Sequence, residues 1–190
     1  MKKIFTRLNP GLLAVPLLLA GSVGYSQNEK GFSLEVQSDD FTLVNFDNPA
    51  FLQHDIDVNG TAMTEIWTAE GATNLEAGAP NVPHYSQSIV IPNEGATVFQ
   101  VTFSDFYEIH NVELAPSKGN LYRNINPADV PYEFGPAYNT DDFYPGSLAD
   151  ISKPYILRDY RAQTITTNPF QYNPVTKVLR VYEDLQVVVV

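Results

Sequence analysis

The residues of this chain that come closest to a metal-binding pattern begin at Asp55. Four positions match the opening of a calcium-binding loop: Asp55, Asp57, Asn59 and Gly60. Such a loop needs a glutamate at its twelfth position, where two carboxylate oxygens bind the ion. The twelfth residue here is Ile66, and Glu65 comes one position early. Because Asn-Gly is also the strongest short signal for a hairpin turn, we predict a β-hairpin rather than this kind of calcium loop. Acidic pairs elsewhere leave a looser calcium site open.

Other catalytic or ligand-binding motifs are missing from the sequence. The chain has no cysteine, which excludes disulfides, thiolate metal sites and a cysteine nucleophile. The three histidines have no zinc-binding spacing: His54, His84 and His110. No phosphate-binding loop, dinucleotide fingerprint or Gly-x-Ser-x-Gly elbow occurs. We assign no catalytic residue, cofactor or metal ligand, although two carboxylates that meet in space as in a glycosidase stay open.

The charge of the chain restricts its partners. Its 11 basic and 22 acidic residues give a formal net charge of −11. Since a nucleic-acid site needs a basic surface to neutralise phosphates, we expect no nucleic-acid partner.

The first 26 residues have the pattern of a secretory signal peptide. It consists of a basic start, an apolar core and small residues before the cut: Lys2, Lys3 and Arg7, then 12–20, then Gly24 and Ser26. The apolar core is too short to span a membrane. We therefore predict an exported protein whose mature part begins at Gln27 and has no membrane segment.

Alternation of apolar and polar residues predicts strands along most of the mature chain. The expected strands are 32–36, 41–44, 55–58, 61–67, 86–91, 97–103, 106–114, 155–157, 160–167 and a closing strand from 178. No helix longer than one turn is expected, and residues 115–146 form a long irregular stretch. We therefore predict an all-β fold in which residues 27–190 form one antiparallel, jelly-roll-like β-sandwich. The expected core includes Phe99, Val101, Phe103, Leu179, Val181 and Val187.

The closing segment organises this prediction. Pro174 fixes a turn at 172–177, and the odd positions from Leu179 onward form an apolar face of one long strand. We expect residues 164–167 to pair with that strand. The chain stops on four valines, so we expect it to be part of a longer protein.

Several segments together resemble the N-terminal propeptide of the gingipain family of cysteine peptidases. They include Pro-Phe-Gln-Tyr-Asn-Pro at 169–174 with 179–182, and Tyr-Ile-Leu-Arg-Asp-Tyr-Arg at 155–161. The others are 78–83 with 86–92, 112–119, and 132–135 with Tyr138 and 143–146. All of them occur in the family's order, whereas residues 27–77 match only as a β-rich lead-in.

The resemblance implies a function that the residues alone do not. Such propeptides are β-sandwich prodomains that assist folding and keep the peptidase latent. The partner would be the cognate cysteine peptidase domain in cis, expected beyond residue 190. The protein would cross the periplasm and be secreted by the type IX system, or stay associated with the outer membrane. The alternative is a secreted carbohydrate-binding module, with aromatic side chains stacking on sugars: Trp67, Tyr122, Tyr132, Tyr138 and Tyr144.

The resemblance also suggests how latency is maintained. Gingipains cut after arginine or lysine, so a basic residue on an exposed loop could fill the specificity pocket. Lys118 and Arg123 lie where the long irregular stretch begins. Arg180 lies inside the closing strand, Arg158 and Arg161 flank another strand, and Lys177 lies in a tight turn. An arginine guanidinium forms two parallel hydrogen bonds with a carboxylate, which lysine cannot do. We therefore expect Arg123, rather than Lys118, to enter the pocket.

Overall fold

The structure is a computed structural model that describes residues 31–38, 41–48 and 50–190. The predicted signal peptide lies outside these residues. The strands are β1 (Phe32–Gln37), β2 (Thr42–Asp47), β3 (Phe51–Val58), β4 (Thr61–Thr68), β5 (Tyr85–Val90), β6 (Phe99–Thr102), β7 (Phe106–His110), β8 (Ala149–Ile151), β9 (Tyr155–Leu157), β10 (Tyr160–Thr167), β11 (Phe170–Asn173), β12 (Val178–Tyr182) and β13 (Asp184–Val189). Two 3-10 helices, η1 (Pro127–Asp129) and η2 (Pro136–Asn139), interrupt the long loop. In the described part of the chain, no helix is long and apolar enough to cross a membrane.

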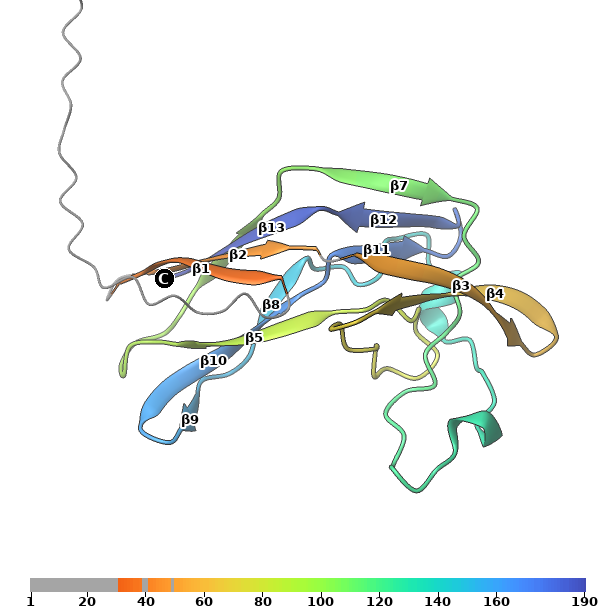
Figure 1. The fold of residues 1–190 in the computed structure, drawn as a ribbon, viewed down its shortest axis with the longest axis horizontal. Coiled ribbons are helices and arrows are strands. Elements are labelled where there is room, and N and C mark those ends of the chain that lie inside the picture. Colours follow the sequence, from red (N-terminus) through yellow and green to blue (C-terminus); the bar gives the residue numbers. More distant parts are fainter. Residues whose placement is uncertain (1–30, 39–40, 49) are drawn as a thin grey trace, which may run out of the picture.

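The strands pair antiparallel and pack in two layers, which confirms the predicted sandwich (Figure 1). One layer has the strand orders β1-β2-β13-β6 and β11-β12-β7, and the other contains β5-β10-β8 with β9 on β10. The β3–β4 hairpin turns at Asn59 and Gly60, both with positive φ, as the sequence predicts. β8 was not expected from the sequence.

The expected single closing strand is wrong, because the chain changes sheets at Glu183. β12 pairs with β11 and β7, whereas β13 pairs with β2 and β6. The odd positions nevertheless stay apolar and buried on both sides of the break, at Leu179 and Val181 and again at Leu185 and Val187. β12 and β13 thus connect the sheet β11-β12-β7 to the sheet β1-β2-β13-β6, and both sheets cover the same core.

The predicted partner of the closing strand is also wrong. Residues 164–167 belong to β10, which pairs with β5, β8 and β9 in the other layer. The four residues of β11 pair with β12 instead, so this strand includes Tyr172 and Asn173, which the sequence placed in the turn. Pro169 has no backbone N–H and fixes φ, so the chain leaves β10 and starts a new strand there.

The core lies between the layers, and five of the six predicted core residues pack in or against it. Leu179, Val181 and Val187 are at most 2% exposed, and Phe99 and Val101 pack partly buried against the core. Phe103 is 46% exposed, so its assignment to the core was wrong. β6 ends at Thr102, and Phe103 lies beyond the sheet, with its ring 5.0 Å from that of Tyr182.

Candidate inhibitory loop

A long loop projects from the sandwich and carries both candidate residues. We call residues 118–131 the basic loop; it includes η1 and extends below the sheets in Figure 1. Its base is tied to the segment around Gly78. The Gly78 N–H donates to the Ser117 carbonyl at 2.9 Å, and the Gly135 N–H donates to the Gly78 carbonyl at 2.8 Å. Gly78 has φ +80°, and a Cβ there would lie 2.8 Å from the Gly135 nitrogen, so this close approach requires glycine.

Lys118 holds the loop together. Its Nζ donates to the Pro127 carbonyl at 2.6 Å and lies 4.1 Å above the centre of the Tyr132 ring. These contacts connect the start of the loop to η1 and to the segment after it. Because they occupy the ammonium group, Lys118 is a support of the loop rather than a free side chain.

Arg123 lies at the tip of the loop. The Ile125 N–H donates to the Tyr122 carbonyl at 3.0 Å, which closes a four-residue turn with Arg123 at its second position. The side chain is exposed, and it makes no hydrogen bond, ion pair or ring contact with any residue that the structure describes. The guanidinium is therefore available to a partner, and its entry into a specificity pocket stays a prediction.

Replacing Lys118 with alanine should loosen the loop without unfolding the sandwich. The change removes one hydrogen bond and one cation–π contact, each worth on the order of 1 kcal/mol at a partly exposed site. We expect faster amide hydrogen exchange over 119–130. Lys118→Met keeps the apolar stem and should behave in the same way. Unchanged exchange in both variants would contradict the supporting role.

Most of the other described cations are already bound. The Arg180 guanidinium donates to Glu108 at 2.7 Å and lies 3.9 Å from the Phe143 ring centre, and Lys177 pairs with Glu113. These two residues therefore stabilise the sheets. Arg158 differs, because it lies exposed in the turn between β9 and β10, although the sequence suggested that it would not protrude.

The aromatic residues considered for sugar stacking do not form one surface. Tyr138 donates its hydroxyl to the Leu114 carbonyl at 2.7 Å, and burial raises its pKa well above the usual value. Tyr144 donates to Glu76, and Tyr132 lies under Lys118. The other two, Trp67 and Tyr122, are exposed but belong to β4 and to the basic loop.

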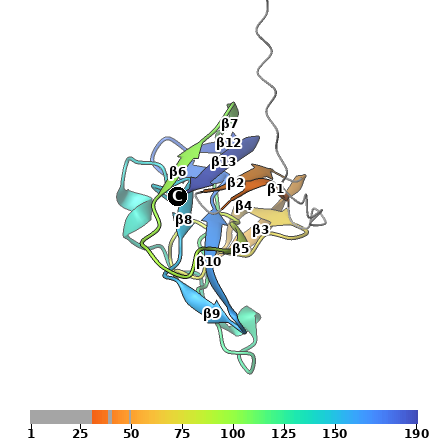
Figure 2. The ribbon, with the colours of Figure 1, turned by 90° about the vertical axis from the view of Figure 1, so that its left-hand side faces the viewer.

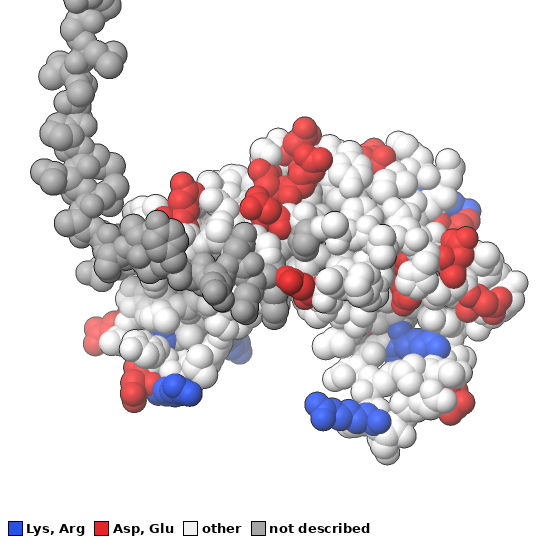
Figure 3. Space-filling model, in the orientation of Figure 1, with Lys and Arg blue, Asp and Glu red and all other residues white. Residues whose placement is uncertain are grey.

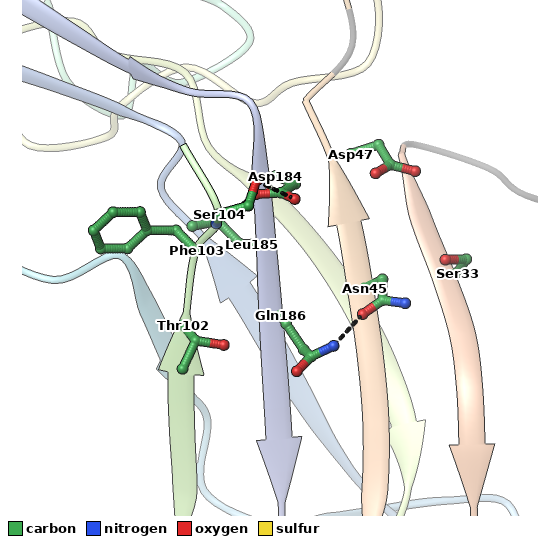
Figure 4. Close-up of a pocket in the computed structure, with 9 residues that line it drawn as sticks. All are labelled: Ser33, Asn45, Asp47, Thr102, Phe103, Ser104, Asp184, Leu185 and Gln186. Carbon is green, nitrogen blue, oxygen red and sulfur yellow. Dashed lines mark hydrogen bonds between the residues drawn. The ribbon is translucent and has the colours of Figure 1, made fainter. Parts of the chain in front are cut away.

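A polar cleft of about 400 Å³ lies elsewhere, on the outer face of β1, β2, β13 and the end of β6 (Figure 4). Gln186 donates to the Asn45 amide oxygen at 3.0 Å, and the Ser104 hydroxyl donates to Asp184 at 2.7 Å. The hydrogen bonds from Ser104 lower the pKa of the Asp184 carboxyl. Most polar side chains of the cleft thus form hydrogen bonds with one another. We therefore assign no ligand to the cleft.

The family of the chain follows from comparison with known proteins. The model of the family described as Propeptide_C25 matches residues 28–190. The chain belongs to this family. Gingipain R2 of Porphyromonas gingivalis is 38% identical to this propeptide over 196 residues, which cover 100% of the chain and 26% of the relative. Lys-gingipain HG66 of the same species is 25% identical over 205 residues, 98% of the chain and 11% of the relative. The chain thus spans about a quarter, or less, of these relatives.

Solved structures agree with the fold of this propeptide. The complex of P. gingivalis RgpB pro- and mature domains contains a chain with TM-score 0.79 and 35% identity, and 84% of each chain is covered. A structure described as giving insight into the zymogenic latency of gingipain K has TM-score 0.70 at 19% identity, and shows the fold alone. The resemblance to gingipain propeptides is therefore confirmed.

The sequence did not reveal the contacts that support the basic loop. Lys118 reaches Pro127 and Tyr132, and Gly78 approaches Gly135, which are pairs far apart in the chain. The available signals were Gly78 and Gly135, since a glycine in an irregular segment often marks a close backbone approach. Neither glycine, however, indicates which distant segment of the chain lies against it.

Proposed function

We propose that this chain is the prodomain of a secreted, gingipain-like cysteine peptidase, and that it maintains latency and assists folding in cis. Arg123 enters the specificity pocket of the peptidase and forms paired hydrogen bonds with a carboxylate there. The peptidase domain lies beyond residue 190 in the precursor. Residues 1–26 direct export into the periplasm, and the type IX system then carries the protein to the outer membrane or beyond.

The observation that carries this proposal is the unpartnered Arg123 on a supported loop. A side chain that is exposed before binding loses no contact of its own when it enters a pocket. The support from Lys118 and the Gly78–Gly135 approach limits the conformational freedom that binding must remove. The chain is also more similar to Gingipain R2 than to Lys-gingipain, at 38% against 25% identity, so the mature domain of Gingipain R2 is the better matched peptidase for a test.

The test is inhibition of the mature domain of Gingipain R2 by the purified chain. We expect reversible inhibition that competes with an arginyl peptide substrate, because both would occupy the same pocket. Absence of inhibition together with tight retention on insoluble glycans would contradict the proposal and favour a carbohydrate-binding module.

A further inference from the structure

The hairpin formed by β9 and β10 exposes apolar side chains at its tip. Ile156 is 69% exposed, Leu157 57% and Tyr160 63%. Leu157 and Tyr160 are directly paired across the hairpin, and Arg158 and Asp159 form the turn between them. Three large, exposed apolar side chains within five residues are more than the scattered exposure that is normal at a surface. The tip therefore has the composition of a contact site.

The base of the same hairpin is fixed to the body. The Tyr155 hydroxyl donates to the Ser88 hydroxyl at 2.7 Å, and the Arg161 guanidinium donates to the Pro92 and Gly95 carbonyls at 2.7 and 2.8 Å. These contacts join β9 and β10 to β5 and the loop after it. A tip mounted on a fixed base loses little conformational freedom on binding, which favours affinity.

Unpartnered positive charge gathers at this hairpin and at the basic loop. Among the described lysines and arginines, three have no hydrogen bond, ion pair or ring contact: Arg123, Lys153 and Arg158. Lys153 lies between β8 and β9, and Arg158 lies at the hairpin tip. The whole chain has a net charge of −11, and the free cations among its described residues lie on the basic loop, at the hairpin tip and just before β9. Figure 3 shows Lys and Arg side chains on both projections, the hairpin and the basic loop.

The two projections point to the same side of the molecule. In Figure 1 the β9–β10 hairpin and the basic loop both extend below the sandwich, and the view turned by 90° in Figure 2 shows the same. A partner that binds Arg123 therefore lies on the side toward which the hairpin points.

We propose that the β9–β10 hairpin is a second docking element for the peptidase, which rests on the function proposed above. Leu157 and Tyr160, which are directly paired and therefore share one face of the hairpin, pack on an apolar patch of the peptidase outside its active site. Carboxylates around that patch pair with Arg158 and Lys153. The basic loop blocks the active site, and the hairpin adds affinity and fixes the orientation of the prodomain.

The test compares two variants of the chain, alone and combined, in binding to the mature domain of Gingipain R2. The hairpin variant carries Leu157→Ser and Tyr160→Ser, the two paired residues of one face, and the loop variant carries Arg123→Ala. We expect the hairpin variant to bind roughly tenfold or more weakly, as interface hot spots do. The factor should be the same in the Arg123→Ala background, because contacts that share no partner act additively.

Matched controls separate docking from folding. Leu52→Ser replaces a leucine on β3 that is 63% exposed and lies outside both projections, and it should leave binding unchanged. Thermal unfolding should be the same for all variants, since the changed side chains are exposed. If the hairpin variant is unstable, the Arg158→Glu variant is used in its place. We expect it to bind more weakly, by a factor that becomes smaller at high salt.

The outcomes distinguish this inference from the proposed function. If the unmodified chain does not bind the peptidase, both are overturned. If Arg123→Ala weakens binding but the hairpin variants bind like the unmodified chain, only the docking role is overturned. It is also overturned if the chain self-associates without peptidase and the hairpin variant abolishes that association, because the tip would then bind a second copy.

Discussion

Replacing Arg123 with alanine should weaken inhibition of the mature domain of Gingipain R2 by about 30-fold or more, the effect of a loss of about 2 kcal/mol at an interface hot spot. The guanidinium makes no hydrogen bond, ion pair or ring contact with the described residues of the free chain, so its removal breaks no such interaction there. The full effect should therefore come from the complex, where a pocket carboxylate would lose two charge-assisted hydrogen bonds. The measurement is the inhibition constant against an arginyl substrate, with unchanged thermal unfolding.

A lysine at the same position separates charge from geometry. Arg123→Lys keeps the positive charge but not the planar pair of donors, so inhibition should fall between that of the unmodified chain and Arg123→Ala. An unchanged inhibition constant for Arg123→Ala, with Lys118→Ala as the variant that weakens inhibition most, would move the pocket residue to Lys118. That result would also mean that Lys118 leaves Pro127 and Tyr132 on binding.

Local signals in the sequence were sufficient for features that depend on a few neighbouring residues. Asn59-Gly60 predicted the β3–β4 turn because both residues adopt positive φ there. The apolar odd positions of the closing segment predicted its buried face. The odd positions remain buried on both sides of Glu183, because β12 and β13 have the same alternation of buried and more exposed residues although they belong to different sheets.

Long-range pairing could not be predicted in the same way. Residues 164–167 alternate as a strand should, but nothing local distinguishes β5 from β12 as their partner. Phe103 continues the alternation of Phe99 and Val101, yet the sheet ends one residue before it. Periodicity indicates which face a residue occupies, whereas the end of a strand depends on where its neighbour stops pairing.

In the basic loop, too, local features could be predicted from the sequence, whereas long-range contacts could not. The composition of residues 115–146 predicted a long surface loop, and the residue types favoured Arg123 over Lys118. The contacts of Lys118 with Pro127 and Tyr132 explain why only one of the two cations is free, and they require the folded loop. The β9–β10 tip was missed because Ile156, Leu157 and Tyr160 read as ordinary strand residues.

Phe46→Ala should destabilise the sandwich by about 3–5 kcal/mol, the usual cost of removing a fully buried phenylalanine. Phe46 is 0% exposed on β2, and its ring centre lies 4.9 Å from those of Phe32 on β1 and Tyr85 on β5. It therefore connects the two layers, and the cavity left by its ring would lie between them.

The matched comparison is Phe103→Ala, which removes a phenylalanine of the same size from a site that is 46% exposed. We expect a loss of about 1 kcal/mol, since roughly half of the burial and the ring contact with Tyr182 at 5.0 Å are removed. Urea unfolding of the two variants measures both losses. Equal losses would mean that Phe103 packs in the core, as the alternation of Phe99, Val101 and Phe103 first suggested, and that the sheet extends past Thr102.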